Sequence, residues 1–273
     1  MKVGIIGCGS MGSMMTDKFY AAGECELFVT TRTLSKLEGL PNDVNVCKTN
    51  SEVAAASDMV FLCVRPDVLK NVLDDIKSAV SPDTLIVSLN GSVRFDRIEK
   101  VLHTKTAKVI PSVTAEIDRS QTLVCYNDLV TEKDKHKLKD LLSCMGDVIE
   151  LAEDELGMGS ELVSCMPGFI ASVFDVMCTS AMEHTSLPKE QVVSMVLNTL
   201  TATGELMLKK GMTFGEVVER VATKGGITEV GSSVIYEQFP HTAQELFEKT
   251  LEKRAQTAEK CSSLFTDDSI ERM

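Results

Sequence analysis

The first 151 residues alternate between short apolar runs and segments in which apolar residues recur every three or four positions. Residues 59–64 are continuously apolar, as expected of a central parallel strand that is buried on both faces. Residues 67–80 carry the helical spacing most clearly. The alternation predicts an α/β fold with a doubly wound sheet and helices on both faces. The expected strands are residues 3–6, 26–31, 44–48, 59–64, 84–89, 107–110, 122–126 and 148–151.

After about residue 153 the strand signals disappear and only helical patterns remain. Residues 168–185 are apolar around much of the helix circumference, so this helix needs cover from its own domain or from a second subunit. Further helices are expected from Pro188 to Leu200 and over residues 216–223, 229–237 and 242–262. We therefore expect a dinucleotide-binding domain at residues 1–153 and an all-helical domain for substrate binding and dimerisation at residues 154–273. A homodimer or higher homo-oligomer through the C-terminal helices follows from this expectation.

A glycine-rich loop comes directly after the first predicted strand. Its first glycine permits the turn, its second lets a diphosphate approach the backbone, and its third lets helix and strand pack closely. The backbone amides at the start of the following helix face the phosphates, and the helix dipole favours negative charge there. A turn that only connects two elements is the simpler alternative. The loop predicts a Rossmann-type cofactor cradle formed by Gly7, Cys8, Gly9, Ser10, Met11 and Gly12.

The end of the second predicted strand bears on the choice of dinucleotide. NAD-binding folds place an acid there, on the ribose 2′-hydroxyl. This chain has Thr31 and Arg32 instead, and a guanidinium forms a charge-assisted fork on a 2′-phosphate. We expect NADP(H) as the cofactor, with NAD(H) as the lesser possibility. The alternative for Arg32 is a solvated surface charge.

Composition narrows the classes of partner and the compartment. The net charge of −12 argues against a nucleic-acid partner, and a small-molecule substrate is expected instead. The nine cysteines are odd in number and contain no Cys-x-x-Cys pair, which is typical of buried reduced thiols. We see neither a signal segment nor an apolar run of about 18 residues, so we expect a cytoplasmic protein without a membrane partner. Nothing in the sequence predicts a metal site.

A second pair of glycines precedes the last long helical pattern. Gly225 and Gly226 leave backbone amides open at a helix start, and Thr228 adds a hydroxyl. Such a turn makes a small anion pocket that suits one carboxylate. A glycine-rich connection between helices is the alternative.

Several motifs, in order and spacing over essentially the whole chain, resemble the pyrroline-5-carboxylate reductases. They are the loop from Gly7 to Gly12, then Val64-Arg65-Pro66, Val109-Ile110-Pro111, Pro167-Gly168-Phe169 and Thr223-Lys224-Gly225-Gly226-Ile227-Thr228.

The resemblance implies an enzyme of proline biosynthesis that reduces 1-pyrroline-5-carboxylate to proline with NADPH. It implies that Gly225, Gly226 and Thr228 bind the substrate, with Thr228 near the imine nitrogen as the catalytic residue. It also implies that Val64, Arg65 and Pro66 line the cofactor.

The chain also departs from the family's motifs. Residues 108–114 lack an asparagine and a second proline, residues 163–168 lack two glycines, and Lys224 replaces a proline. These departures fall around the expected nicotinamide and substrate pocket, whereas the phosphate cradle is intact. A reductase of a related imine and a non-catalytic NADP-binding regulator therefore stay open.

Two other classes of enzyme share the first domain. A β-hydroxyacid dehydrogenase needs a lysine in the helix after Pro167, and the first lysine there is Lys189. A coenzyme F420-linked NADP reductase does not account for the long helical C-terminal half.

Overall fold

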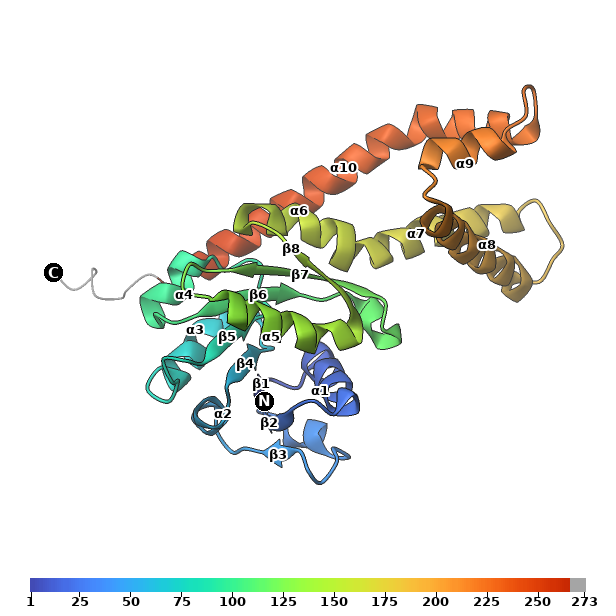
Figure 1. Ribbon diagram of the computed structural model, residues 1–273. Coiled ribbons are helices and arrows are strands. Elements are labelled where there is room, and N and C mark those ends of the chain that lie inside the picture. Colours follow the sequence, from blue (N-terminus) through green and yellow to red (C-terminus); the bar gives the residue numbers. More distant parts are fainter. Residues whose placement is uncertain (266–273) are drawn as a thin grey trace. The chain divides into compact units, whose positions relative to one another are not determined.

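A computed structural model describes residues 1–265. Its sheet has the strand order β3-β2-β1-β4-β5-β6-β7-β8 (Figure 1). Strands β6 and β7 pair antiparallel, and every other neighbouring pair in this sheet is parallel. All eight expected strands are confirmed, and none follows β8 within the described residues. The strands are β1 Lys2–Ile6, β2 Glu26–Thr30, β3 Asn45–Val46, β4 Met59–Leu62, β5 Leu85–Ser88, β6 Thr106–Ile110, β7 Ser120–Tyr126 and β8 Gly146–Glu150.

Helices cover both faces of the sheet, which confirms the doubly wound fold. Alternate strand residues build the two sides: Val3 and Phe61 pack with α1 and α5, and Ile6 and Val60 pack with α2, α3 and α4. Burial of this apolar surface holds the layers together. The helices are α1 Ser10–Ala22, α2 Asn50–Ala56, α3 Pro66–Ile76, α4 Phe95–Val101, α5 Glu132–Leu142, α6 Leu156–Ser160 and the π-helical turn η5 Glu161–Cys165, with single turns η1 Leu34–Leu37, η2 Val113–Ile117, η3 Ser143–Met145 and η4 Glu153–Glu155.

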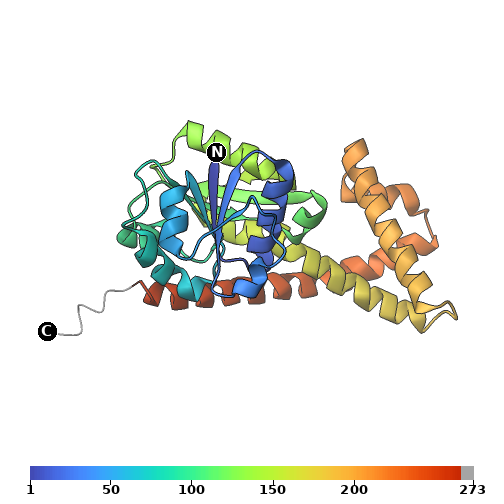
Figure 2. The same ribbon diagram turned by 90° about the horizontal axis from the view of Figure 1, so that it is seen from below.

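The last helix, α10 Ile227–Ser263, differs from the two helices expected over residues 229–237 and 242–262. It runs without interruption through Pro240. A proline removes one hydrogen bond, but each side of Pro240 has several hydrogen-bonded turns of its own, so the helix continues. The end of α10 lies on the α2–α3–α4 face of the sheet (Figure 2). Cys261 and the following Phe265 pack with buried residues of these helices.

The structure divides into two compact units. The first is Met1–Pro167 together with the described residues from Leu251, and the second is Gly168–Thr250. The functional boundary expected between residues 153 and 154 stays a prediction, and residues 266–273 of that expected domain lie outside the described residues.

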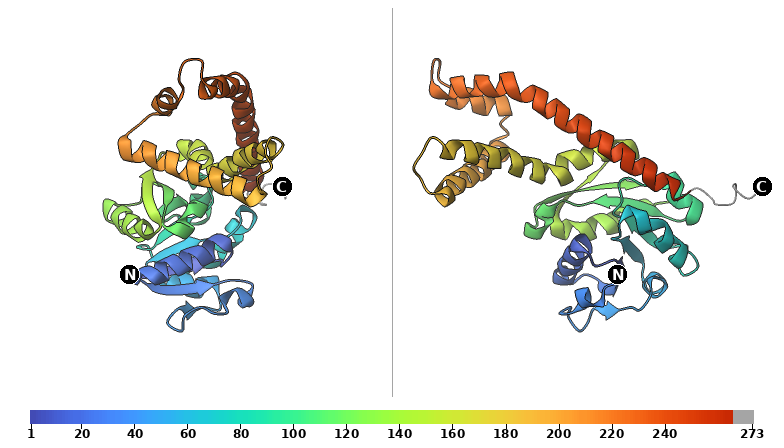
Figure 3. Two further views of the ribbon diagram at one scale, coloured as in Figure 1. Left: turned by 90° about the vertical axis from the view of Figure 1, so that its right-hand side faces the viewer. Right: turned by 180° about the vertical axis from the view of Figure 1, so that it is seen from behind.

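The second unit contains helices joined by short loops (Figure 3). The expected helix over residues 168–185 is confirmed as α7, and all of its apolar side chains except Cys178 are exposed or half-buried in a single chain. By length and composition alone, Glu153–Met182 could also cross a membrane, a test that core helices of soluble proteins pass as well. The helices are α7 Met166–Met182, α8 Lys189–Lys210, α9 Phe214–Val221 and the first part of α10.

Candidate functional site

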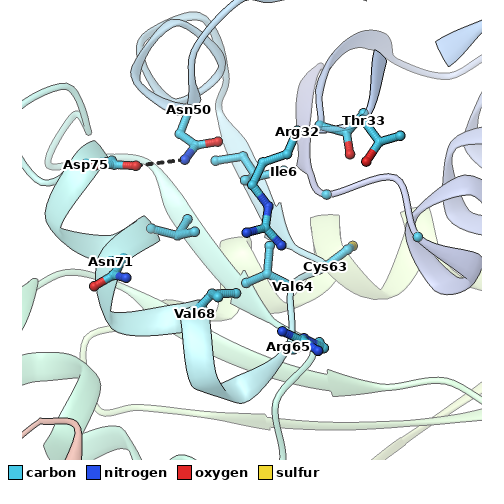
Figure 4. Close-up of a pocket in the computed structure, with 14 residues that line it drawn as sticks. Ile6, Arg32, Thr33, Asn50, Cys63, Val64, Arg65, Val68, Asn71 and Asp75 are labelled. Atoms are coloured by element: carbon cyan, nitrogen blue, oxygen red, sulfur yellow. Dashed lines mark hydrogen bonds between the residues drawn. The ribbon is translucent and has the colours of Figure 1, made fainter. Parts of the chain in front are cut away.

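A cleft of about 370 Å³ opens in the first unit at the carboxyl ends of the strands (Figure 4). It lies where the strand order reverses between β1 and β4, the position at which open α/β sheets bind ligands. Among the expected cofactor residues, it is lined by Gly7, Gly9, Thr31, Arg32, Val64 and Arg65. The other lining residues are Ile6, Thr33, Asn50, Cys63, Val68, Asn71, Val72 and Asp75.

The three glycines of the loop differ in what requires them. Gly7 has a φ of +100°, and a Cβ there would lie 2.6 Å from the carbonyl oxygen of Cys63. A Cβ at Gly12 would overlap the carbonyl oxygen of Gly7. A Cβ at Gly9 would meet no atom within 4 Å. The protein's own packing therefore explains Gly7 and Gly12, whereas Gly9 keeps a space open that suits a diphosphate.

Helix α1 begins directly beside that space. Gly9 is its N-cap residue, and the Gly9 carbonyl accepts the N–H of Ser13. The N–H groups of the first turn, at Ser10 and Met11, have no partner inside the helix. Within the described residues no side chain caps this end, and the first turn contains no acid. The positive end of the helix is thus left to an anionic ligand.

The loop contains one cysteine, Cys8, and a second, Cys63, lies next to the loop. Cys8 is buried, with its thiol 4.0 Å from the carbonyl oxygen of Thr30, and burial raises its pKa. Cys63 lines the cleft, and burial raises its pKa as well. Both thiols are therefore neutral and act as small apolar groups. For Cys8, the backbone is therefore suited to a cofactor contact and the buried thiol is not.

The rim near the end of β2 carries the expected positive charge. Figure 4 shows the side chain of Arg32 extended across the cleft. Arg32 forms no ion pair within the part of the chain that the structure describes, so its guanidinium is available to a phosphate.

Arg65 contributes less to the cleft. It lies just before Pro66, the first residue of α3, and pairs with Asp67 at 3.0 Å. Its side chain is 75% exposed, and exposed pairs of this kind add little stability.

The wall of the cleft formed by α2 and α3 could not be recognised as part of the site from the sequence pattern. Thr49 is the N-cap residue of α2, and its hydroxyl accepts the N–H of Glu52 at 3.1 Å. The side-chain amide of Asn50 donates a hydrogen bond to the Asp75 carboxylate, and both residues line the cleft. Asn71 and Asp75 are exposed residues one turn apart on α3, and both line the cleft. This four-residue spacing of two polar side chains was the one sequence signal that could have indicated a polar wall here.

The turn before α10 belongs to the second unit and differs from expectation. Gly225, with a φ of +71°, donates its N–H to the Glu229 carboxylate at 2.6 Å. Gly226 donates its N–H to the Thr223 carbonyl at 2.8 Å. The expectation of two open glycine amides is therefore wrong, because both already have partners. Thr228 is exposed in the first turn of α10. Binding of substrate at this turn stays a prediction.

The sheet, the glycine loop and the cleft define a protein of the Rossmann-type nucleotide-binding class. The family model "NADP oxidoreductase coenzyme F420-dependent" matches residues 2–91, and "Pyrroline-5-carboxylate reductase dimerisation" matches residues 153–257. Pyrroline-5-carboxylate reductase 3 of Bacillus subtilis is 35% identical over 258 residues, covering 92% of this chain and 95% of the relative. The chain belongs to the pyrroline-5-carboxylate reductase family.

Two further comparisons extend this result. ComE operon protein 4 of Bacillus subtilis is 25% identical over 92% of this chain and 94% of the relative, and its name states no reaction. A crystal structure of Plasmodium falciparum pyrroline carboxylate reductase with NADP bound is 22% identical. It covers 94% of this chain and 98% of its own, with a TM-score of 0.84. The structural likeness supports the fold along nearly the whole chain.

Proposed function

We propose that this chain is an oxidoreductase that reduces 1-pyrroline-5-carboxylate to proline with NADPH. The observation that carries the proposal is the glycine loop from Gly7 to Gly12. The chain's membership of the pyrroline-5-carboxylate reductase family indicates the reaction that the bound cofactor serves. The N–H groups at Ser10 and Met11, in the first turn of α1, have no partner inside the helix and no side-chain cap, and the loop's one unconstrained glycine, Gly9, borders the space for a diphosphate. Arg32 supplies the positive charge for the 2′-phosphate and so favours NADPH over NADH.

When bound, the cofactor supplies a hydride for the imine carbon, and a proton reaches the ring nitrogen, so that the C=N bond becomes the C–N bond of proline. The chain's own residues bind and orient the substrate. We assign the substrate carboxylate to the Gly225–Gly226 turn and the ring nitrogen to the Thr228 hydroxyl. The Gly225 amide must then exchange Glu229 for the substrate carboxylate. The N–H groups of Ile227 and Thr228, which have no partner inside α10, are further donors.

A homo-oligomer, in its simplest form a dimer, is part of the proposal. The second unit exposes large apolar side chains, for example Leu208 at 78%, Phe214 at 79% and Ile227 at 94%. Surfaces of this kind are typical of protein interfaces, and the dimerisation model matches this region. Sedimentation of the purified protein tests the assembly. A cytoplasmic location stays a prediction.

The alternative is an NADP-binding regulator without turnover. Glu229 favours it, since this acid already holds the Gly225 amide that a substrate carboxylate would use. NADPH oxidation on addition of 1-pyrroline-5-carboxylate, with proline identified as the product, distinguishes the two. NADPH binding without turnover on any cyclic imine would favour the regulator, and no NADPH binding would overturn both.

A further inference from the structure

A buried ion pair lies in the part of α10 that belongs to the first unit, where α10 passes beside α6 (Figure 1). Arg254 donates to one carboxylate oxygen of Glu161 twice, from Nε at 3.0 Å and from Nη2 at 2.7 Å. Its Nη2 also lies 3.2 Å from the Ser160 hydroxyl. The Glu161 side chain is only 2% exposed. A cation 93 residues away in the sequence thus reaches a carboxylate inside the first unit.

Stability does not explain this pair. Within the described residues the other oxygen of Glu161, Oε2, is buried without a hydrogen-bond partner. A buried acceptor without a partner costs free energy, and taking two charges out of water can cost more than their attraction supplies. Some proteins keep buried polar or ionic groups because these fix one conformation among several. The Arg254–Glu161 pair is therefore expected to define the position of a segment.

Glu161 is the first residue of a segment with an unusual backbone. Between α6 and α7 the helix passes through η5, the π-helical turn over Glu161–Cys165. A π turn forms i→i+5 hydrogen bonds, and such turns are frequent at functional sites. One additional residue in a helix rotates the side chains that follow it by about 100° around the axis. The orientation of these side chains thus depends on the π form of η5.

The η5 turn contacts the end of β6. The Ser164 hydroxyl donates to the carbonyl oxygen of Pro111 at 3.1 Å, and Pro111 directly follows β6. Strands β1, β4, β5 and β6 are parallel, so this end of β6 lies on the same edge of the sheet as the cofactor cleft. With the 2′-phosphate at Arg32, the nicotinamide half of the cofactor is expected across the reversal of strand order, toward β4, β5 and β6.

We propose that Arg254, through Glu161, holds η5 in its π form and so positions the wall that η5 and the end of β6 present to the nicotinamide. Both are positioning residues, because the Glu161 carboxylate is buried and Arg254 acts through it. The inference rests on the proposed function in one respect, namely that hydride transfer takes place at this edge of the sheet.

The main test replaces both charges with apolar side chains, in Glu161→Met/Arg254→Met of the full-length protein. The urea midpoint should stay at or above the wild-type value, because a buried ion pair and an unpartnered oxygen are removed together. The kcat for 1-pyrroline-5-carboxylate should nevertheless fall by about 30-fold, since a misplacement of about 1 Å can cost on the order of 100-fold. The dissociation constant of NADPH should change by less than about twofold, because the glycine loop and Arg32 are untouched.

A deuterium isotope effect identifies the step that has slowed. NADPH with deuterium at the transferred C4 position is compared with ordinary NADPH at saturating substrate. A misplaced nicotinamide slows hydride transfer itself, so we expect the double variant to have a lower kcat with the deuterated cofactor. Equal rates with the two cofactors would show that another step, such as product release, has slowed.

Two further variants make the result specific. Arg254→Lys keeps the charge but loses the two-point contact of the guanidinium, so its kcat should lie between those of wild type and the double variant. Lys249→Met/Glu245→Met removes an exposed ion pair from the same helix and should leave kcat at the wild-type value.

The outcomes separate this inference from the proposed function. A wild-type kcat in the double variant overturns the inference alone, as would an NADPH affinity that falls as far as kcat. If the double variant does not fold, Arg254→Lys decides: a lowered kcat with unchanged NADPH affinity supports the positioning role, and a wild-type kcat overturns it. No turnover of 1-pyrroline-5-carboxylate by wild type overturns the proposed function together with the inference.

Discussion

Two glycine turns precede helices in this chain, and they differ in what their amides face. At Gly7 to Gly12 the first turn of α1 has no internal cap, and Gly9 borders open space. At Gly225 and Gly226 both amides already donate, to Glu229 and Thr223. The first turn is therefore ready for an anion. The second must release one of its own contacts before it can accept a substrate carboxylate at Gly225. Two similar glycine-rich sequences thus differ in structure. The first leaves the helix N-terminus without a cap, and the second has both glycine amides already hydrogen-bonded.

The largest expected effect comes from adding one methyl group at the second glycine of the first loop. Gly9→Ala should leave the free energy of unfolding unchanged, because the new Cβ meets no protein atom within 4 Å. It should weaken NADPH by about 100-fold, since the methyl group occupies the approach to the backbone. Calorimetric titration measures the binding.

Gly12→Ala is the matched variant in the same loop. Its Cβ would overlap the Gly7 carbonyl, so we expect a loss of about 2–3 kcal/mol of unfolding free energy in denaturant titrations. Wild-type NADPH affinity in Gly9→Ala would show that the loop is only a connection.

Thr228→Ala tests the second turn. Loss of the hydroxyl should lower kcat for 1-pyrroline-5-carboxylate by about 100-fold, the lower end for a positioned proton-transfer group, and leave the dissociation constant of NADPH unchanged. Steady-state NADPH oxidation gives the first value, and calorimetry gives the second. Thr242→Ala, at another exposed threonine of α10, is the control. Unchanged turnover in Thr228→Ala would remove this residue from the site.

The sheet and the first loop could be predicted from sequence because their signals are local. Buried parallel strands such as β4 are continuously apolar, and each glycine position of the loop has its own steric reason. The end of β2 could be interpreted as well, since Arg32 stands where other folds carry an acid.

The missed features depend on contacts that the local pattern does not show. Asn50 and Asp75 are 25 residues apart and meet only when α2 and α3 pack together. Glu229 had a recognisable signal, because an acid at the third position of a helix commonly reaches back to an amide before it. Applied to residues 225–229, that rule predicts the self-capped turn.

Arg32→Ala sharpens the account of the first site by its effect on two cofactors. We expect NADPH to bind about 30-fold more weakly and NADH to change by less than about threefold, because only NADPH carries the 2′-phosphate that the guanidinium meets. Titration of both cofactors against the same variant measures the difference. Equal losses for the two would show that Arg32 does not contact the 2′-phosphate.

The smallest expected effect tests the self-capped turn directly. In Glu229→Gln the Gly225 amide keeps an acceptor, but a neutral one that holds it less strongly than a carboxylate. The negative charge that opposes an incoming substrate carboxylate is also lost. We therefore expect the KM for 1-pyrroline-5-carboxylate to fall by about threefold with kcat unchanged, in the same NADPH oxidation assay. Glu237→Gln removes the same charge two turns further along α10 and should leave KM at the wild-type value. If KM rises in Glu229→Gln, the Glu229 carboxylate supports substrate binding instead of competing with it, and the two turns are more alike than their amides suggest.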